Sequence, residues 1–245
     1  MKQTSKKTKQ DSDEAFVLHC WPYRETSTIV EIFSRNYGRI SLVARGARRP
    51  KSALSNALHP FQPLHLTWRG ESSLRNLYRA EWLGGLPQLS GMALICGFYL
   101  NELLMKLLHK DDPHETLYLS YRETLLAIGL QTDSASILRR FEKQLLKDLG
   151  YAMTLEYEVE YGRPIETENT YIYVADQGPI LYEGACGNEN RLELSGKTLL
   201  DIAKDEYRDP VTQQQSKALM RMLISHHLGN QVLHSRQLLR DLQQI

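Results

Sequence analysis

The chain has 245 residues, of which 42% are hydrophobic and 24% are charged, and its formal net charge is +1. This is the composition of a globular protein, and it excludes the fibrous, collagen-like and wholly disordered classes. The length fits one large domain or two of modest size.

The net charge conceals an asymmetry along the chain. Residues 1–82 carry 14 Lys and Arg against 7 Asp and Glu, a net of +7, and residues 83–245 carry the remaining 16 against 22, a net of −6. Such a division is typical of two modules with different partners. The basic part suits an anionic ligand such as nucleic acid, although a solvated basic surface explains the sum of charges equally well.

Features of the N-terminus and of the cysteines indicate the compartment. Cys20, Cys96 and Cys186 are too few and too scattered for a disulfide framework or a four-cysteine zinc site. The first 14 residues are polar and lack the apolar core of a signal peptide. The most apolar stretch, 92–108, is interrupted by polar residues and predicts a buried helix instead of a membrane span. We therefore expect a cytoplasmic protein in a reducing compartment.

The N-terminal part of the chain has the pattern of a small β-domain. Apart from Met1, residues 1–13 contain no large apolar residue, and they are predicted to be a disordered tail. Short segments rich in β-branched and aromatic residues, or in strict alternation, follow at 16–18, 28–33, 39–45, 61–68 and 75–82. About five strands within ~70 residues are typical of a small barrel or sandwich.

After Gly84 the apolar period changes from two to about 3.6 residues, which favours helices. Residues 171–174 and 180–182, separated by a turn with Gly and Pro, predict a hairpin. Helices are predicted at about 91–108, 113–130, 134–149, 195–204, 212–228 and 235–244. The residues therefore predict an α+β chain, with a small β-domain first and a mainly helical part with a hairpin after it.

Motifs for catalysis are sparse. The sequence has no glycine-rich phosphate loop, no dinucleotide fingerprint and no nucleophile elbow. His109 and His114 flank Asp111 and Asp112, a group that could bind a metal but is better explained by capping and turn roles. His226-His227 is a poor ligand pair, because adjacent side chains on a helix diverge by about 100°.

The most informative constellation is basic. The segment 45–51 places four cations in seven residues of a Gly- and Pro-containing loop. Further arginines come from neighbouring strands and connections: Arg24, Arg39, Arg69, Arg75 and Arg79. Such a surface neutralises phosphates without reading sequence. Tyr23 and Tyr37 either stack on bases or pack turns, and Trp68 is better explained as part of the core.

A second group of cations lies on the predicted helix 134–149. Arg139, Lys143 and Lys147 recur at every fourth residue beside the apolar stripe, and Arg140 is adjacent. This face could hold an acidic peptide with a hydrophobic end, but a solvated face is the default explanation from the residues alone.

Several segments together resemble the RecO family of DNA repair proteins. The most specific run is Tyr23 to Ala47, with its Glu-Thr-Ser and Gly-Arg-Ile-Ser-Leu-Val-Ala-Arg-Gly-Ala segments. The other matching segments are 16–19, 59–64, 99–104, 138–142, 149–151 and 235–239. The resemblance covers about residues 15–242 in the same order.

The resemblance implies an N-terminal oligonucleotide-binding (OB) barrel over 14–83 and a helical domain over 84–245. It implies a recombination mediator of the RecF pathway without enzyme activity, at the nucleoid of a bacterium. Such proteins bind single- and double-stranded DNA and anneal complementary strands. They engage RecR and the acidic C-terminal tail of single-stranded DNA-binding protein, and they help to load RecA onto coated strands.

The resemblance also suggests which residues form the sites. The expected DNA contacts are Arg24, Arg39, Arg45, Arg48, Arg49, Lys51, Arg69 and Arg75. The expected contacts to the acidic tail are Arg139, Arg140 and Lys143.

One departure from the family concerns zinc. Many members carry a four-cysteine zinc knob in the region that corresponds to about 155–190, where this chain has Cys186 alone. One thiolate cannot hold a tetrahedral site, so we predict no structural zinc and no cofactor. Two alternative functions remain: a hydrolase or nucleotidyltransferase that acts on nucleic acid, and an RNA-binding OB module.

Overall fold

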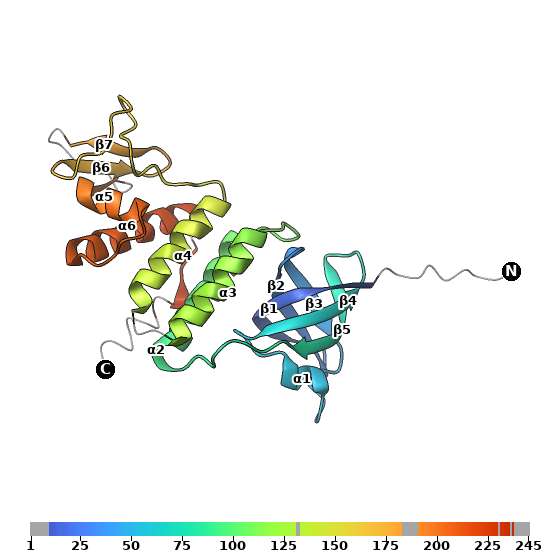
Figure 1. Ribbon diagram of the computed structural model, residues 1–245. Helices are drawn as coiled ribbons and strands as arrows, with labels where there is room; N and C mark the ends of the chain where they lie inside the picture. The colour runs from blue at the N-terminus through green and yellow to red at the C-terminus, as the bar shows by residue number, and fades with distance from the viewer. Residues whose placement is uncertain (1–9, 131–132, 183–190, 230, 236, 238–245) are drawn as a thin grey trace. The chain divides into compact units, whose positions relative to one another are not determined.

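The computed structural model describes residues 10–130, 133–182, 191–229, 231–235 and 237 (Figure 1). The chain divides into two compact units. Unit 1 comprises Met1–Leu130 and Leu233–Ile245, and unit 2 comprises Gln131–Val232. In this division the first two long helices belong with the β-domain, whereas the domain boundary near residue 84 stays a prediction.

Unit 1 begins with a closed five-stranded barrel in the order β1-β2-β3-β5-β4. β3 and β5 pair in parallel, and the other neighbours are antiparallel. A short helix, α1 (Ala53–Ala57), lies between β3 and β4. The strands are β1 (Gln10–Tyr23), β2 (Ser27–Ser34), β3 (Gly38–Ala44), β4 (Pro63–Arg69) and β5 (Leu74–Trp82). The predicted OB-like barrel is therefore confirmed.

Strand β1 starts at Gln10, inside the segment predicted to be a disordered tail, and pairs with the end of β4. The buried carboxylate of Asp13 explains this start. Its Oδ2 accepts hydrogen bonds from the hydroxyl of Ser34 and from the backbone N–H of Asn36, the latter at 2.7 Å. Polar contacts of this kind order a segment that has few apolar residues. The rest of the predicted tail, residues 1–9, lies outside the described residues.

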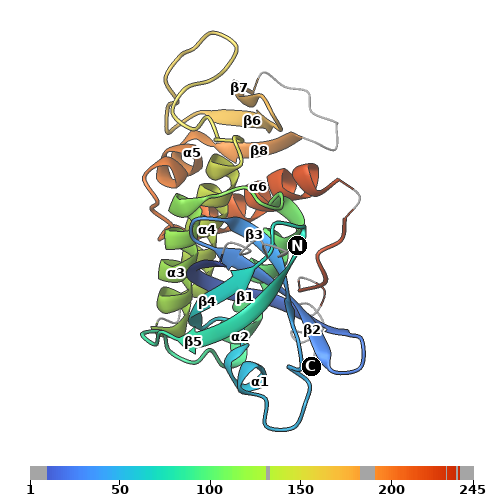
Figure 2. The same cartoon turned by 90° about the vertical axis from the view of Figure 1, so that its right-hand side faces the viewer.

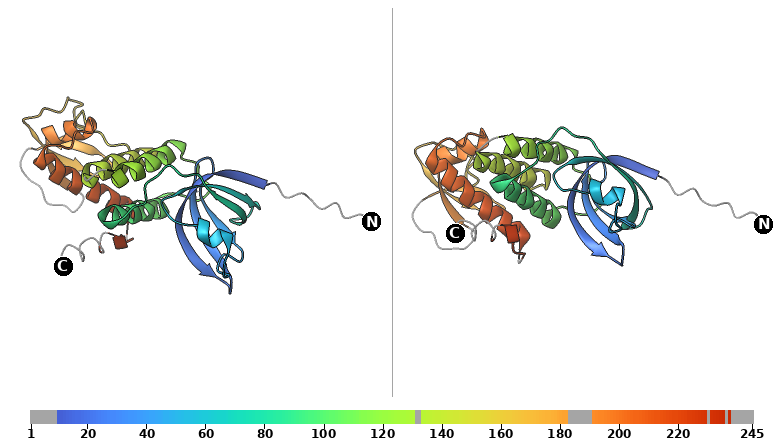
Figure 3. Two further views of the ribbon diagram at one scale, coloured as in Figure 1. Left: turned by 60° about the horizontal axis from the view of Figure 1, so that its bottom comes forward. Right: turned by 90° about the horizontal axis from the view of Figure 1, so that it is seen from below.

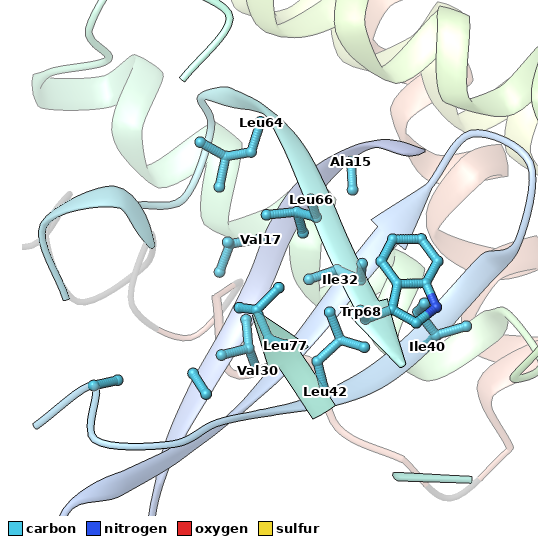
Figure 4. Close-up of a cluster of buried hydrophobic side chains, with 12 residues drawn as sticks. Ala15, Val17, Val30, Ile32, Ile40, Leu42, Leu64, Leu66, Trp68 and Leu77 are labelled. Atoms are coloured by element: carbon cyan, nitrogen blue, oxygen red, sulfur yellow. The ribbon is translucent and has the colours of Figure 1, made fainter. Parts of the chain in front are cut away.

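The barrel is filled by side chains that alternate along the strands (Figure 4). Ile40, Leu42 and Ala44 face inward as the alternation predicts. Trp68 is fully buried in the same cluster, with the ring of Tyr37 edge-on at 5.2 Å.

Two helices of unit 1, α2 (Gly91–Leu107) and α3 (Glu115–Leu130), match the predicted ranges closely. They cover part of the outer barrel surface. Asn101 of α2 donates its side-chain N–H to the carbonyl of Leu18 at 2.9 Å, and Phe16 lies 5.1 Å from the ring of Tyr121. The connection between the helices approaches the turn before β3 so closely that a Cβ on Gly38 would lie 1.8 Å from the carbonyl oxygen of Asp112.

The chain returns to unit 1 near its C-terminus. Glu102 of α2 accepts hydrogen bonds from the backbone N–H of His234 at 2.9 Å and of Ser235 at 2.8 Å. Burial acts to raise the pKa of Glu102, but hydrogen bonds from the Ser235 hydroxyl, from these two backbone N–H groups and from Lys106 outweigh it, so the pKa lies below its ordinary value. Most of the predicted helix 235–244 lies outside the described residues.

In its described residues, unit 2 combines three helices with a small antiparallel sheet in the order β7-β6-β8 (Figure 2). β6 and β7 confirm the predicted hairpin, and β8 is an additional strand. The elements are α4 (Ser134–Asp148), β6 (Thr170–Val174), β7 (Gly178–Leu181), β8 (Arg191–Ser195), α5 (Gly196–Ala203) and α6 (Pro210–Leu228). Together the two units confirm the α+β class.

Candidate nucleic-acid interface

The basic loop that follows β3 is anchored to the barrel by its backbone. Ala47 is 3% exposed and belongs to the barrel core. The N–H of Arg48 donates to the carbonyl of Thr26 at 2.9 Å, and the N–H of Arg49 to that of Gly46 at 3.0 Å. Gly46 has a φ of 70°, a conformation that glycine adopts without strain. Backbone hydrogen bonds and the buried Ala47 therefore hold the loop in place.

Five exposed cations gather around this loop, and we call them the basic cluster: Arg24, Arg45, Arg48, Arg49 and Lys51. Arg24 comes from the β1–β2 turn, which the Arg48–Thr26 hydrogen bond ties to the loop. The β1–β2 hairpin and α1 lie at the same end of the barrel (Figure 3). The turn also carries one exposed carboxylate, Glu25, so the cluster keeps a clear positive excess. Its arginines can reach phosphates without desolvating other groups.

Arg39 and Arg75 differ from the other predicted DNA contacts, because both are held in internal ion pairs. The Nε of Arg39 lies 3.0 Å from Oε1 of Glu31, and the Arg39 side chain is 15% exposed. A further nitrogen of Arg39 donates to the carbonyl of Met105. Nη2 of Arg75 lies 2.6 Å from Oδ1 of Asp111. Both arginines thus fasten the barrel to the segment around the α2–α3 connection.

Arg69 is exposed at the end of β4, apart from the basic cluster. Its guanidinium lies 5.1 Å from the ring centroid of Tyr78, and it donates to Gln10 at 2.8 Å. Arg79 forms an exposed pair with Glu81 at 2.7 Å.

The aromatic residues proposed as stacking platforms fall into two groups. Trp68 is buried inside the barrel, and the half-buried Tyr37 packs against the core and donates its hydroxyl to Asp11 at 3.3 Å. Tyr23 is half-buried beside Arg24. Sequence reasoning missed His19 and Trp21, which are exposed on the same strand. Their alternation with Tyr23 is the signal that could have found them.

The three cations predicted to bind an acidic tail have unequal surroundings on α4. Nη2 of Arg139 lies 2.7 Å from Oε1 of Glu142, a fully buried carboxylate. Lys143 donates to the carbonyls of Ile202 and Ala203 at 2.8 and 3.0 Å, where α5 ends.

Arg140 is the exposed member of this group. Its guanidinium lies 6.0 Å from the ring centroid of Tyr207 and donates to the carbonyl of Asp205 at 3.1 Å. Arg139 and Lys143 therefore stabilise unit 2, whereas Arg140 retains a surface that a ligand can reach.

Groups considered for catalysis or metal binding have ordinary partners. Asp111 pairs with Arg75, and Oδ2 of Asp112 lies 3.3 Å from Nε2 of His114. Within the described ranges, no three or more His, Cys, Asp or Glu are grouped so that they could hold a metal ion. Cys186, the residue that bears on zinc, lies outside those ranges.

The adjacent histidines of α6 both approach one carboxylate. Nε2 of His226 lies 2.5 Å from Oδ2 of Asp176, and Nε2 of His227 lies 3.9 Å from its Oδ1. Tyr151 stacks on His227 at 3.7 Å between centroids. Burial, with a smaller contribution from the charge of His226, lowers the pKa of His227, although Asp176 opposes the shift. A structural role in unit 2 accounts for these contacts.

None of the helices in the described part of the chain is both long enough and apolar enough to cross a membrane.

Comparison with known proteins places both parts of the chain in one family. The family model "Recombination protein O N terminal" matches residues 9–86, and the family model "Recombination protein O C terminal" matches residues 88–237. The DNA repair protein RecO of Nitrosospira multiformis is 52% identical over 240 residues, which is 98% of each chain. The proteins of the same name from Aromatoleum aromaticum and Azoarcus sp. are 47% and 46% identical, over 98% and 96% of this chain and 100% and 98% of theirs.

Proposed function

The chain belongs to the RecO family of DNA repair proteins, and from this premise we propose that it is a recombination mediator. It binds single- and double-stranded DNA, anneals complementary strands and, with RecR, helps to load RecA onto strands coated with single-stranded DNA-binding protein. It does so without a catalytic step of its own. The observation that carries the proposal is the basic cluster on an anchored loop at one end of the barrel.

The basic cluster supports the DNA-binding part of the proposal through charge. Phosphate groups on two strands repel each other, and arginines that neutralise them allow the strands to approach. Contacts to the backbone carry little base specificity, so base pairing between the strands selects the complement. Arg69, exposed at the end of β4 and apart from the basic cluster, is a separate proposed contact, whereas Arg39 and Arg75 support the proposed surface by fixing the barrel to the α2–α3 connection.

Unit 2 provides the proposed docking site for the acidic tail of single-stranded DNA-binding protein. Arg140 is its centre because its guanidinium is exposed on α4. Lys143 ties α4 to the end of α5, and Arg139 pairs with the buried Glu142 of its own helix. The tail brings the mediator to strands that are already coated.

The test is annealing of complementary fluorescent oligonucleotides coated with single-stranded DNA-binding protein, with and without its acidic tail. The assay contains no nucleotide and covers a range of salt concentrations. Annealing that is salt-sensitive and depends on the tail is the expected result. Arg140→Glu should lose the tail dependence and keep annealing of bare strands. Absence of annealing by folded protein would refute the proposal.

Two control arms separate the alternative functions. Matched RNA strands replace DNA in one arm, and equal annealing of both would favour an RNA-binding module. In the other arm the labelled oligonucleotide is incubated with divalent metal ions. Turnover that Asp111→Asn or Asp112→Asn abolishes would favour a hydrolase or nucleotidyltransferase.

A further inference from the structure

Three aromatic rings follow one another along the last part of β1. His19, Trp21 and Tyr23 alternate with Cys20 and Pro22, and Cys20 packs against the barrel core. His19 is exposed, Trp21 is 38% exposed and Tyr23 is half-buried. The rings of His19 and Trp21 lie 4.5 Å apart between centroids. Alternate residues of a strand share a face, so the three rings form one row on the outer surface of the barrel.

The row begins where the cover provided by the helices ends. Phe16 packs against Tyr121 of α3, and Asn101 of α2 bonds to the carbonyls of Val17 and Leu18. The pairing of β1 with β2 shifts between Val17 and His19. After this irregularity His19, Trp21 and Pro22 are exposed. The hairpin extends past the body of the barrel (Figure 2).

The row ends at the basic cluster. The guanidinium of Arg24 lies 5.2 Å from the ring centroid of Tyr23, and Nη1 of Arg48 donates to the carbonyl of Arg24 at 3.4 Å. The aromatic row of the hairpin thus leads to Arg24 in its turn and to Arg48 in the loop after β3. This is the combination that holds single strands: rings stack on unpaired bases, and cations bind the backbone.

We propose that His19, Trp21 and Tyr23 form a platform on which unpaired bases of single-stranded DNA stack, while the basic cluster holds the backbone beside it. The inference rests on the proposed function and deepens it by assigning separate residues to the two kinds of DNA. Duplex DNA keeps its bases stacked inside and contacts the basic cluster alone. An apolar protein partner fits this surface less well, because five cations lie at its end.

The experiment compares the binding of Trp21→Ala to a labelled oligo-dT strand and to a duplex of the same length, at one salt concentration. Loss of one stacked base should weaken single-strand binding by about tenfold and leave duplex binding within about twofold. The slope of affinity against salt should not change, because no charge is removed. Trp21→Phe should restore most of the affinity, since it keeps a ring.

The matched control is Trp82→Ala. Trp82 is 66% exposed at the end of β5, outside the aromatic row. The Trp82→Ala variant should bind both kinds of DNA with the affinity of the unmodified chain. Thermal unfolding of each variant checks that the barrel is intact.

A fluorescence measurement tests the platform without altering it. In Trp82→Phe the emission comes from Trp21 and from the fully buried Trp68. Single strands should quench the Trp21 component, and duplex at equal occupancy should quench it much less. Equal quenching would overturn the platform.

Other outcomes distinguish the platform from the function on which it rests. If Trp21→Ala weakens both DNAs equally, or neither, while removal of Arg48 and Arg49 weakens both, the platform is refuted and DNA binding stands. If the unmodified folded chain binds no DNA at all, the proposed function fails first.

Discussion

Removing three charges from the basic cluster should reduce the salt dependence of DNA binding by a defined amount. The variant combines Arg48→Gln, Arg49→Gln and Lys51→Gln. Glutamine has a shorter side chain but keeps a polar end without the charge. Backbone hydrogen bonds anchor the loop, so the loop should keep its position. The change therefore tests charge separately from shape.

The magnitude follows from counterion release. Each phosphate contact contributes ~0.7 to the slope of log K against log salt for single strands and ~0.9 for duplex. Three lost contacts lower the slope by at most ~2 for single strands and ~2.7 for duplex. Between 50 and 200 mM salt, the unmodified chain should lose roughly 20-fold more single-strand affinity than the variant.

Fluorescence anisotropy of a labelled oligonucleotide across a series of KCl concentrations measures both slopes. The control removes three exposed cations of unit 2, Lys147, Lys217 and Arg221, and has the same net charge as the variant. Its slope should match that of the unmodified chain. Equal slopes of log K against log salt for the unmodified chain and the basic-cluster variant would refute the argument, because the loop cations would then contact no phosphates.

Further predictions concern stability and reactivity. Gly38→Ala should destabilise unit 1 by about 1–3 kcal/mol in urea unfolding, because its Cβ would meet the carbonyl of Asp112 1.8 Å away. Gly162→Ala, at nearly the same φ of 69° but with no atom within 4 Å, should cost less, and equal costs would contradict the steric argument. His227 has a pKa lowered chiefly by burial, so its neutral form favours the fold. Its contribution is present above the ordinary histidine pKa and is lost as the pH falls below it. The unfolding temperature should therefore fall as the pH is lowered from about 7 to 5. The fall should be less steep in His227→Gln, and an equal fall in both proteins would show that His227 is not its cause. Burial raises the pKa of Cys20 to about 11, so alkylation of its thiol in native protein at pH 8 should be slow. Peptide mass mapping measures this rate, and rapid labelling would contradict the burial.

The sequence was sufficient to predict those helices and strands whose apolar residues face a single core. The barrel strands follow from alternation, as with Ile40 and Leu42, and α2, α3 and α4 follow from their helical period. It was insufficient where order depends on partners distant along the chain. The start of β1 depends on Asp13 binding the turn after β2, and β8 depends on pairing with β6.

The candidate site divides in the same way. Loop composition identified Arg45, Arg48 and Arg49 as exposed cations, since glycine and proline mark a surface loop whatever packs nearby. Strand alternation placed Arg39 on the outer face correctly, but alternation does not reveal what covers that face. The segment around Met105 covers it, and this is a contact that no local pattern encodes.

The contact between Glu102 and Ser235 has a consequence for how the chain is made. The two residues are 133 positions apart, whereas all five barrel strands lie between Gln10 and Trp82. On the ribosome the barrel can close early, with its basic cluster in place, because domains fold as they emerge. The acceptor oxygens of Glu102 receive the donors of Ser235 only after a further 133 residues have been added to the chain. A chain released before Ser235 would therefore carry the barrel and its cations but leave α2 without the segment that ends unit 1.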